Sequence, residues 1–308
     1  MSTMQAVQTN APARPDPAQT RGGIDLHAHT TASDGSFSPT ELIDEAAAIG
    51  LAAIAVTDHD TIGGLAEAKI AATAAGVELV PGVELSVEDD GGRFHLLGYL
   101  FDPDNDKFAS TLTSIRASRA KRNEQMAVKM AELGLPVTMD DVRAQAGDKG
   151  EVIARPHFAK ALLKAGVVNS VQDAFDRFLA TGKPLYLPKE VLTPTDAVAL
   201  IHDAGGVAVM AHPGLVPLSD SAFVDRLAWL VDNTGMDGIE AYYSQHTPAQ
   251  TERFLELAGR HNLVVTGGSD FHGTAKPHVP LGIVYQKRSA NRQLLHSLKA
   301  ARLSGGKH

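Results

Sequence analysis

Two histidines one residue apart, His27 and His29, are the first residues in the chain whose type and spacing suggest chemistry. They follow the apolar run GIDL, and Asp34 comes five residues after the second histidine. In an extended segment, alternate side chains point to the same face, so both imidazoles could reach one ion while Ala28 points away. The pair alone is weak support for a metal site, because a solvated turn would give the same pattern.

Histidines and carboxylates recur at the ends of later apolar runs. They are His59 after LAAIAVTD, Glu84 at the end of GVELVPGVE, His95 within RFHLLGYL, His212 after GGVAVMA, Glu240 after DGI, and Asp270 and His272 in GGSDFH. In a closed β/α barrel the chemistry lies where strands end and helices begin. Repeated use of these residue types at such points favours a metal centre over a chance pattern.

The residue types also indicate the kind of ion. Imidazole and carboxylate without any cysteine suit Mn²⁺, Zn²⁺ or Fe²⁺. About six histidines and three carboxylates are too many for one ion and enough for two or three that share bridging carboxylates. Multinuclear sites of this kind hydrolyse phosphate esters.

The segments between the apolar runs have helical spacing and the capping residues of helices. They span residues 39–50, 63–76, 194–206 and 247–262, with Pro, Ser or Thr near the start and Gly at the end of several. Hydrophobic residues make up 44% of the 308 residues and aromatic residues only 5%, which suits parallel strands packed on small-residue helices. Alternation of strand and helix predicts an α/β fold with a parallel sheet.

Residues 103–186 interrupt this alternation. The stretch 111–135 predicts one long helix, and 138–147, 155–166 and 170–182 predict shorter ones. We therefore expect a barrel formed by residues 22–102 and 187–303, with a helical insertion at 103–186 that caps the active site. Residues 1–21 are polar and rich in Pro and Ala, without the apolar core of a signal peptide, and predict a disordered leader.

Charge and hydropathy exclude several classes of partner. The formal net charge is −8, and no strongly basic run is present, which argues against binding of duplex DNA. No run approaches the roughly 18 apolar residues of a membrane span. We expect a cytoplasmic protein that acts on a small anionic substrate, with positive charge supplied locally by metals and arginines.

The motifs DLHAHTTASDGSFSP, TDHDT, GVELS, FHLLGY, ARPHF, AHPG and GSDFH occur in this order. As an ordered set over residues 23–300, they resemble the polymerase and histidinol phosphatase (PHP) family, and within it the bacterial 3′,5′-nucleoside bisphosphate phosphatases and related 5′→3′ exoribonucleases. The resemblance implies a distorted (β/α)₇ barrel with two or three ions, with Mn²⁺ expected and Zn²⁺, Fe²⁺ or Mg²⁺ as alternatives.

The resemblance also implies a role for each motif residue. His27, His29, Glu84 and Asp270 would hold the first ion, and Asp34, His59 and His272 the second. Glu84, His95 and His157 would hold a third. His212 would face the substrate or complete the centre, and Asp34 or His212 could protonate the leaving oxygen. Without the resemblance, His157 would read as a capping or surface histidine.

Basic residues of the insertion are candidates for binding the substrate. Arg116, Arg119 and Arg122 are three residues apart, so they would share one helix face, either as a solvated stripe or as a phosphate clamp. Arg155 is close in sequence to His157, and Lys189 is a weaker candidate. Asp25, Asp58 and Asp60 flank the histidines and could orient imidazoles or cap helices.

The resemblance implies removal of the 3′-phosphate of nucleoside 3′,5′-bisphosphates. Hydrolysis of short RNA from its 5′ end and histidinol-phosphate hydrolysis stay open, as does a C–N bond hydrolase of similar fold. A non-catalytic PHP module is the alternative outside enzymes, and no motif position in this chain is visibly lost.

Overall fold

The structure, a computed structural model, describes residues 14–146, 153–188 and 190–303. Seven strands form one sheet whose order in space follows the chain. They are β1 (Ile24–Asp25), β2 (Ala53–Val56), β3 (Glu78–Asp89), β4 (Gly92–Tyr99), β5 (Val207–Met210), β6 (Gly238–Tyr243) and β7 (Val264–Gly268).

The sheet curls into a barrel with one reversed strand. β4 returns from β3 as a hairpin, so its pairings with β3 and β5 are antiparallel, and all other pairings are parallel. Just beyond β1, the Leu26 N–H donates to Gly267 O at 3.1 Å and brings the first and last strands together. This nearly closed arrangement confirms the predicted distorted (β/α)₇ fold.

Helices cover the barrel. They are α2 (Pro39–Ala48), α3 (Leu65–Ala75), α8 (Pro194–Asp203), α9 (Asp220–Thr234), α10 (Pro248–Arg260) and α11 (Arg292–Leu303). Ser38, Thr193 and Thr247 each accept a backbone N–H of the helix that follows, with proline at the first helical position. Each of these caps fixes the residue at which the preceding loop ends and the helix begins.

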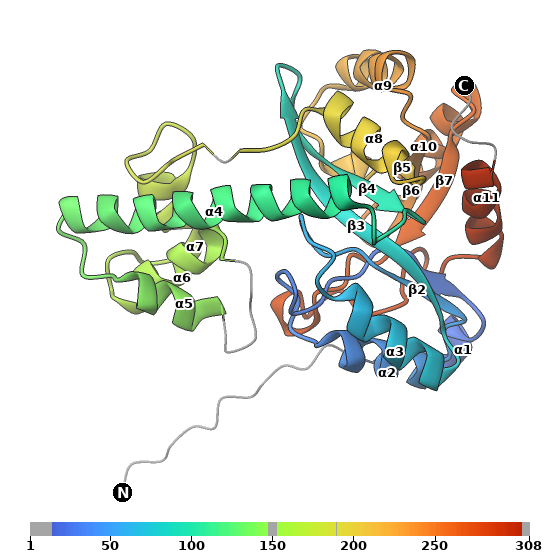
Figure 1. Cartoon of the computed structure of the whole chain (residues 1–308), viewed down its shortest axis with the longest axis horizontal. Helices are drawn as coiled ribbons and strands as arrows, with labels where there is room; N and C mark the ends of the chain where they lie inside the picture. Colours follow the sequence, from blue (N-terminus) through green and yellow to red (C-terminus); the bar gives the residue numbers. More distant parts are fainter. Residues whose placement is uncertain (1–13, 147–152, 189, 304–308) are drawn as a thin grey trace, which may run out of the picture.

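Between β4 and α8 the chain forms a group of helices that we call the helical segment. It consists of α4 (Asp106–Glu132), α5 (Met139–Ala146), α6 (Arg155–Lys164), α7 (Val171–Ala174) and a π-helical turn (Phe175–Leu179). The long helix α4 begins beside the barrel and runs away from it, with α5, α6 and α7 gathered around its far half (Figure 1). Met126, Met130, Phe158 and Leu162 belong to a hydrophobic cluster within these helices, separate from the two clusters of the barrel.

Part of the predicted leader is ordered in the structure. Residues 17–20 form α1 (Pro17–Thr20), whose N-cap Asp16 accepts the Ala18 N–H, and the buried Thr20 hydroxyl donates to Ile49 O. These contacts attach residues 16–20 to the barrel, so the prediction of a disordered leader through residue 21 is wrong there. Residues 1–13 and Lys189 lie outside the described residues.

Among the residues that the structure describes, no helix combines the length and hydrophobicity needed to cross a bilayer.

Candidate metal centre and substrate pocket

The segment after β1 holds two histidine rings on one side. Backbone hydrogen bonds tie it to the end of β7: Asp270 N–H donates to His27 O at 2.8 Å, and His29 N–H donates to Phe271 O at 2.9 Å. This extended pairing places the His27 and His29 rings 5.2 Å apart, as the alternation of side chains predicts. The same pairing brings Asp270 next to them.

Four buried side chains form the first group of ligand atoms. Glu84 Oε2 lies 3.2 Å from Nε2 of both His27 and His29. Asp270 Oδ1 lies 3.3 Å from His29 Nε2 and 3.6 Å from His27 Nε2. One donor atom from each residue falls within 4.8 Å of the others, the separation expected around one cation. The members are those that the family resemblance implies for the first ion.

A second group adjoins the first and shares His29. Asp34 Oδ1 lies 3.3 Å from His272 Nε2, and its other oxygen lies 3.8 Å from His59 Nε2. His29, Asp34, His59 and His272 together satisfy the same distance limit. Asp34 is the most exposed of the four, with 33% of its side chain accessible, so this group faces the surface opening.

The third group differs from the one implied by the resemblance. His95 Nδ1 lies 2.8 Å from Glu84 Oε1, and His59 Nδ1 lies 3.2 Å from Glu84 Oε2. His59 takes the place expected for His157, which the structure does not bring into any of the three groups. His157 Nδ1 instead accepts the Ala154 N–H at the start of α6, at 3.0 Å. The ligand role of His157 stays a prediction.

The donor set fits divalent ions. Both ring nitrogens of His29 are buried without a hydrogen-bond partner, although carboxylate oxygens lie close to each of them. An unsatisfied buried imidazole is costly, and a cation between the nitrogen and the carboxylates would remove that cost. The structure thus provides His/Asp/Glu clusters able to bind metal ions.

Crowding of charges shifts the pKa values of these groups. Burial raises the pKa of Glu84, but His59, His95 and His27 outweigh it and hold that pKa well below its ordinary value. Burial lowers the pKa of His59 to about 3, which keeps its ring neutral and able to donate a lone pair. For His29 the nearby carboxylates outweigh burial and raise the pKa to about 9.

Glu240 is a functional residue that the sequence did not separate from an ordinary strand-end carboxylate. Its side chain is fully buried, with Oε1 3.0 Å from His27 Nδ1, and Oε2 accepts the His212 N–H at 2.8 Å. A carboxylate at Nδ1 fixes the proton there and leaves Nε2 of His27 free for an ion. Glu240 lies within β6, and its position directly after the apolar run DGI was the signal that the sequence offered.

Tyr243 and Lys276 were also missed. Asp270 Oδ2 accepts from the Tyr243 hydroxyl at 2.9 Å and from Lys276 Nζ at 2.7 Å. These two bonds occupy one carboxylate oxygen of Asp270 and leave Oδ1 facing the histidines. Nothing in the spacing of the sequence pairs residues 243 and 276 with Asp270.

The three aspartates that flank ligand histidines accept hydrogen bonds from the backbone and hydroxyl groups of neighbouring loops. Asp25 accepts backbone N–H groups of His27, Ser269 and Gly282 at 2.8–3.2 Å. Asp58 accepts from Thr30 and Ser33, and Asp60 accepts from Ser86 and pairs with Arg119. They hold the ligand-bearing loops against one another.

His212 contacts the centre from the end of β5. Its Nε2 lies 2.8 Å from Glu84 Oε1 and 3.3 Å from His95 Nδ1. The backbone of His212 is in the left-handed region, with φ 27°, and the Gly214 N–H that follows donates to His246 Nε2 at 3.1 Å. His246, which matches no motif, thus helps to hold the loop of His212.

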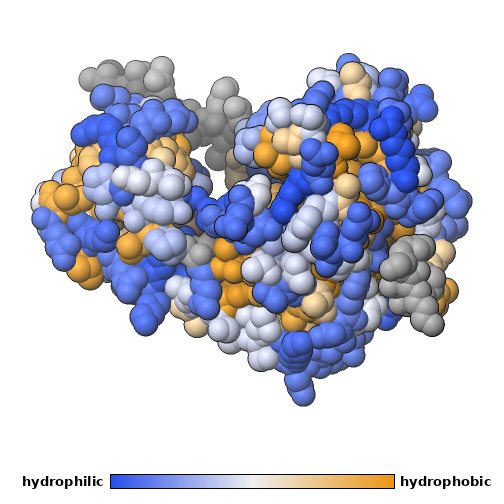
Figure 2. All heavy atoms as spheres, turned by 90° about the horizontal axis from the view of Figure 1, so that it is seen from above, coloured by the Kyte–Doolittle hydropathy of each residue, from blue (hydrophilic) through white to orange (hydrophobic). Residues whose placement is uncertain are grey.

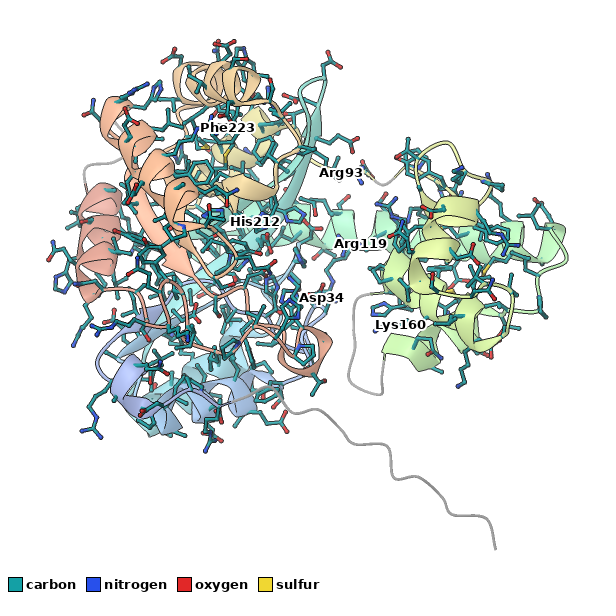
Figure 3. The ribbon with its side chains drawn as sticks, turned by 180° about the vertical axis from the view of Figure 1, so that it is seen from behind. Asp34, Arg93, Arg119, Lys160, His212 and Phe223 are labelled. Carbon is teal, nitrogen blue, oxygen red and sulfur yellow. The ribbon has the colours of Figure 1, made fainter. Side chains whose placement is uncertain are left out.

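A pocket of about 270 Å³ joins the ligand groups to the helical segment. The surface is hollowed between the barrel and this segment, with hydrophilic residues at the bottom of the hollow (Figure 2). The pocket is lined by Asp34, His59, Ser86, Arg93, His95, Arg119, Arg122, Ala154, Arg155, Pro156 and Phe175. Asp34 and Arg93 face it from the barrel, and Arg119 of α4 lies between the two parts (Figure 3).

The arginines in this pocket differ in their partners. Arg119 pairs with Asp60, and Arg93 donates to Glu88 at 3.0 Å. Arg122 is only 7% exposed and has no carboxylate partner within the described part of the chain. Burial and the neighbouring guanidinium groups of Arg119, Arg155 and Arg93 lower its pKa to about 10.

Two details of the arginine predictions follow from these contacts. Arg93, on β4, was missed, because the hairpin register that aims it into the pocket is not visible in the sequence. Arg116 donates to Thr61 at 3.4 Å and does not line this pocket.

Comparisons with known proteins agree with this architecture. The profile of the PHP domain matches residues 25–178. A 3′,5′-nucleoside bisphosphate phosphatase of Chromobacterium violaceum is 39% identical over 249 residues, which cover 81% of this chain and 87% of that protein. A 5′-3′ exoribonuclease of Haemophilus influenzae is 38% identical over 252 residues, covering 80% and 89%.

A solved structure from Bifidobacterium adolescentis, assigned as a metal-dependent phosphoesterase, superposes with a TM-score of 0.76. It is 34% identical, and the match covers 97% of this chain and 98% of that one. The chain therefore belongs to the PHP domain family.

Proposed function

We propose that this chain, a metal-dependent phosphoesterase of the PHP family, removes the 3′-phosphate of nucleoside 3′,5′-bisphosphates. The observation that carries the proposal is one pocket that is lined both by the ligand residues Asp34, His59 and His95 and by four arginines. A bisphosphate needs two anion sites, one where the ester is cleaved and one for the other phosphate. The relative from C. violaceum that bears this name supports the choice.

The ligand groups would hold two or three ions, and Mn²⁺ is the ion we propose. His27, His29, Glu84 and Asp270 would hold one, and Asp34, His59 and His272, with His29 beside them, another. Glu84, His59 and His95 would hold the third. When bound, divalent ions supply Lewis-acid chemistry that activates water and offsets the charge of the phosphate oxygens.

The arginines would bind the phosphate that is not cleaved. Arg122 is the strongest candidate, because its buried guanidinium lacks a counter-charge that a phosphate would supply. Arg155 lies over the Tyr186 ring at 5.6 Å, which holds its side chain in place. Arg119 already has Asp60 as its partner, so we assign it to shaping the pocket and to a weaker phosphate contact.

The roles of the two predicted catalytic residues differ. Asp34 lines the pocket and is partly exposed, so its carboxylate can reach the substrate side of the centre. His212 does not line the pocket, and its Nε2 is directed at Glu84. We therefore propose that His212 holds the carboxylate of Glu84 in position. Asp34 would act on the substrate side of the centre, next to the oxygen that leaves.

Hydrolysis of short RNA from its 5′ end is the second candidate. The relative from H. influenzae named as a 5′-3′ exoribonuclease favours it, because it is nearly as similar as the bisphosphate phosphatase. The same pocket could hold a 5′-terminal phosphate and nucleotide. Histidinol phosphate has a single phosphate and would leave the buried Arg122 without a counter-charge.

Turnover of three substrates by the Mn²⁺-loaded chain tests the proposal. We expect adenosine 3′,5′-bisphosphate to give adenosine 5′-monophosphate and phosphate with the highest kcat/KM. Adenosine 3′-monophosphate as the product would contradict the placement of the 3′-phosphate at the ligand groups. Faster release of nucleoside 5′-monophosphates from a 5′-phosphorylated trinucleotide would favour the RNA candidate, and faster hydrolysis of histidinol phosphate would exclude both.

A further inference from the structure

The pocket has an apolar side that the metal centre and the arginines do not use. Ala154, Pro156 and Phe175, all from the helical segment, form this side. Phe175 contributes the only aromatic ring other than histidine among the described residues that line the pocket. The barrel side, by contrast, consists of charged and polar residues such as Asp34 and His95.

Phe175 is held in a fixed position. It begins the π-helical turn, and its carbonyl accepts the Ala180 N–H at 2.9 Å. The side chain is partly buried against the hydrophobic cluster of the helical segment, so part of its surface is left toward the pocket. π-helical turns occur often at functional sites, where they redirect a side chain. A partly buried ring held by this packing can stack its remaining exposed surface on a flat ligand.

Among the residues that the structure describes, the side chains of the apolar side offer no groups that would read the edge of a base. Ala154 and Pro156 have no polar side-chain atoms, and Ser86 is bonded to Asp60, with its hydroxyl donating at 3.1 Å. The remaining lining groups are the arginines and the ligand residues, which suit phosphate. Base faces stack on aromatic rings whatever the base, whereas discrimination between bases needs hydrogen bonds to their edges.

From these observations we infer that Phe175, with Pro156 beside it, is the platform for the nucleobase, and that the site accepts purines and pyrimidines alike. The inference rests on the proposed function and makes it more specific. A nucleotide would then place its cleaved phosphate at the ligand groups, its second phosphate at Arg122 and Arg155, and its base on Phe175. Phe175 is thus the residue that distinguishes a nucleotide from a sugar bisphosphate.

The test compares two substrates in three proteins. The substrates are adenosine 3′,5′-bisphosphate and 1-deoxyribose 3,5-bisphosphate, which keeps the 2-hydroxyl and lacks only the base. The proteins are the unaltered chain, Phe175→Ala and Phe178→Ala. Phe178 is the matched control, because it packs against the same cluster from the same turn but does not line the pocket. Binding is measured by calorimetry and turnover by phosphate release.

We expect the unaltered chain to prefer the nucleotide over the abasic compound by about tenfold, the size of one base stacked on an aromatic ring. Phe175→Ala should abolish that preference while leaving the abasic compound unchanged within about twofold, and Phe178→Ala should keep the preference. Equal binding of the two compounds by the unaltered chain, or equal losses for both in Phe175→Ala, would overturn the inference.

Calorimetry keeps this test separate from that of the proposed function. Binding of both compounds without phosphate release would refute the bisphosphatase activity and would still show whether Phe175 contacts the base. A purine-to-pyrimidine ratio of affinities above about a hundredfold would contradict recognition by stacking alone.

Discussion

The carboxylate of Glu240 joins two residues of the centre: Oε1 lies 3.0 Å from His27 Nδ1, and Oε2 accepts the His212 N–H at 2.8 Å. Glu240 comes from β6, His27 follows β1 and His212 follows β5. One buried side chain of β6 therefore sets the orientation of residues that follow two other strands. This dependence leads to the first prediction.

Glu240→Gln should weaken metal binding by about 10- to 100-fold, as loss of a partner behind a ligand histidine does. An amide has one acceptor oxygen where the carboxylate has two, so either His27 or His212 loses its partner. Metal titration followed by calorimetry measures the effect. Glu256→Gln, on α10 and paired with Arg260 at the surface, is the control that should leave affinity unchanged. Unaltered affinity in Glu240→Gln would show that the contact does not orient His27.

Arg122→Met should raise KM for adenosine 3′,5′-bisphosphate by roughly 30-fold, since a hydrogen bond to a charged group contributes about 2 kcal/mol. Stability should not fall, because the substitution removes a buried guanidinium that has no carboxylate partner. Steady-state kinetics and urea unfolding together separate the two effects. A stable variant with unchanged KM would exclude Arg122 from the phosphate site.

Asp60→Asn should destabilise the fold by about 3 kcal/mol, because it leaves the buried Arg119 without its counter-charge. Asparagine tolerates the left-handed backbone of this residue, whose φ is 53°, so the loss reports on charge and not on strain. Urea denaturation measures it. Asp140→Asn, which breaks a surface pair with Arg143, should cost at most about 0.5 kcal/mol. Equal effects of the two substitutions would contradict the structural role of the Asp60–Arg119 pair.

The pair His202–Asp237 should make stability depend on pH. His202 Nε2 lies 2.7 Å from Asp237 Oδ2, and this hydrogen bond raises the pKa of His202 above its ordinary value. A histidine whose pKa is raised in the folded state contributes its full stabilisation at pH values below its pKa in the unfolded chain, which is about 6.5. This contribution to the free energy of unfolding is lost as the pH rises through the pKa of the folded state.

His202→Gln should therefore lower the free energy of unfolding more at about pH 6 than at about pH 9. Thermal or urea unfolding at both values measures the difference. The exposed His278, substituted in the same way, is the control for the loss of a histidine as such. A larger loss of unfolding free energy for His202→Gln at high pH would give the opposite pH dependence. It would show that the His202–Asp237 pair is not the cause.

The sequence predicted those parts of the centre that depend on strand ends. His27 and Asp270 each follow an apolar run that forms a strand, and the parallel strands bring such ends together at one edge, close to Glu84 within β3. The barrel and the positions of its capped helices were accessible for the same reason, because periodicity and capping residues are local signals.

The remaining features depend on tertiary contacts. Arg93 enters the pocket through the register of the β3–β4 hairpin, and Lys276 reaches Asp270 from a loop. Arg119 was predicted as a phosphate ligand, but its pairing with Asp60 joins residues 59 positions apart. Spacing along the chain carries no information on such long-range pairings. His157 differs, because its ring accepts the Ala154 N–H three residues before it, a local capping contact that the sequence suggests without the family resemblance.

The most direct test of the account is the metal content and phosphate release of Glu84→Gln, measured on the same sample. Glu84 belongs to two ligand groups and contacts His27, His29, His59, His95 and His212. We predict the loss of at least one ion per chain and a fall in kcat on adenosine 3′,5′-bisphosphate of roughly a thousandfold or more. Glu78→Gln, at the far end of β3, should retain both. Normal metal content with normal turnover in Glu84→Gln would contradict the central claim that this cluster is the catalytic metal centre.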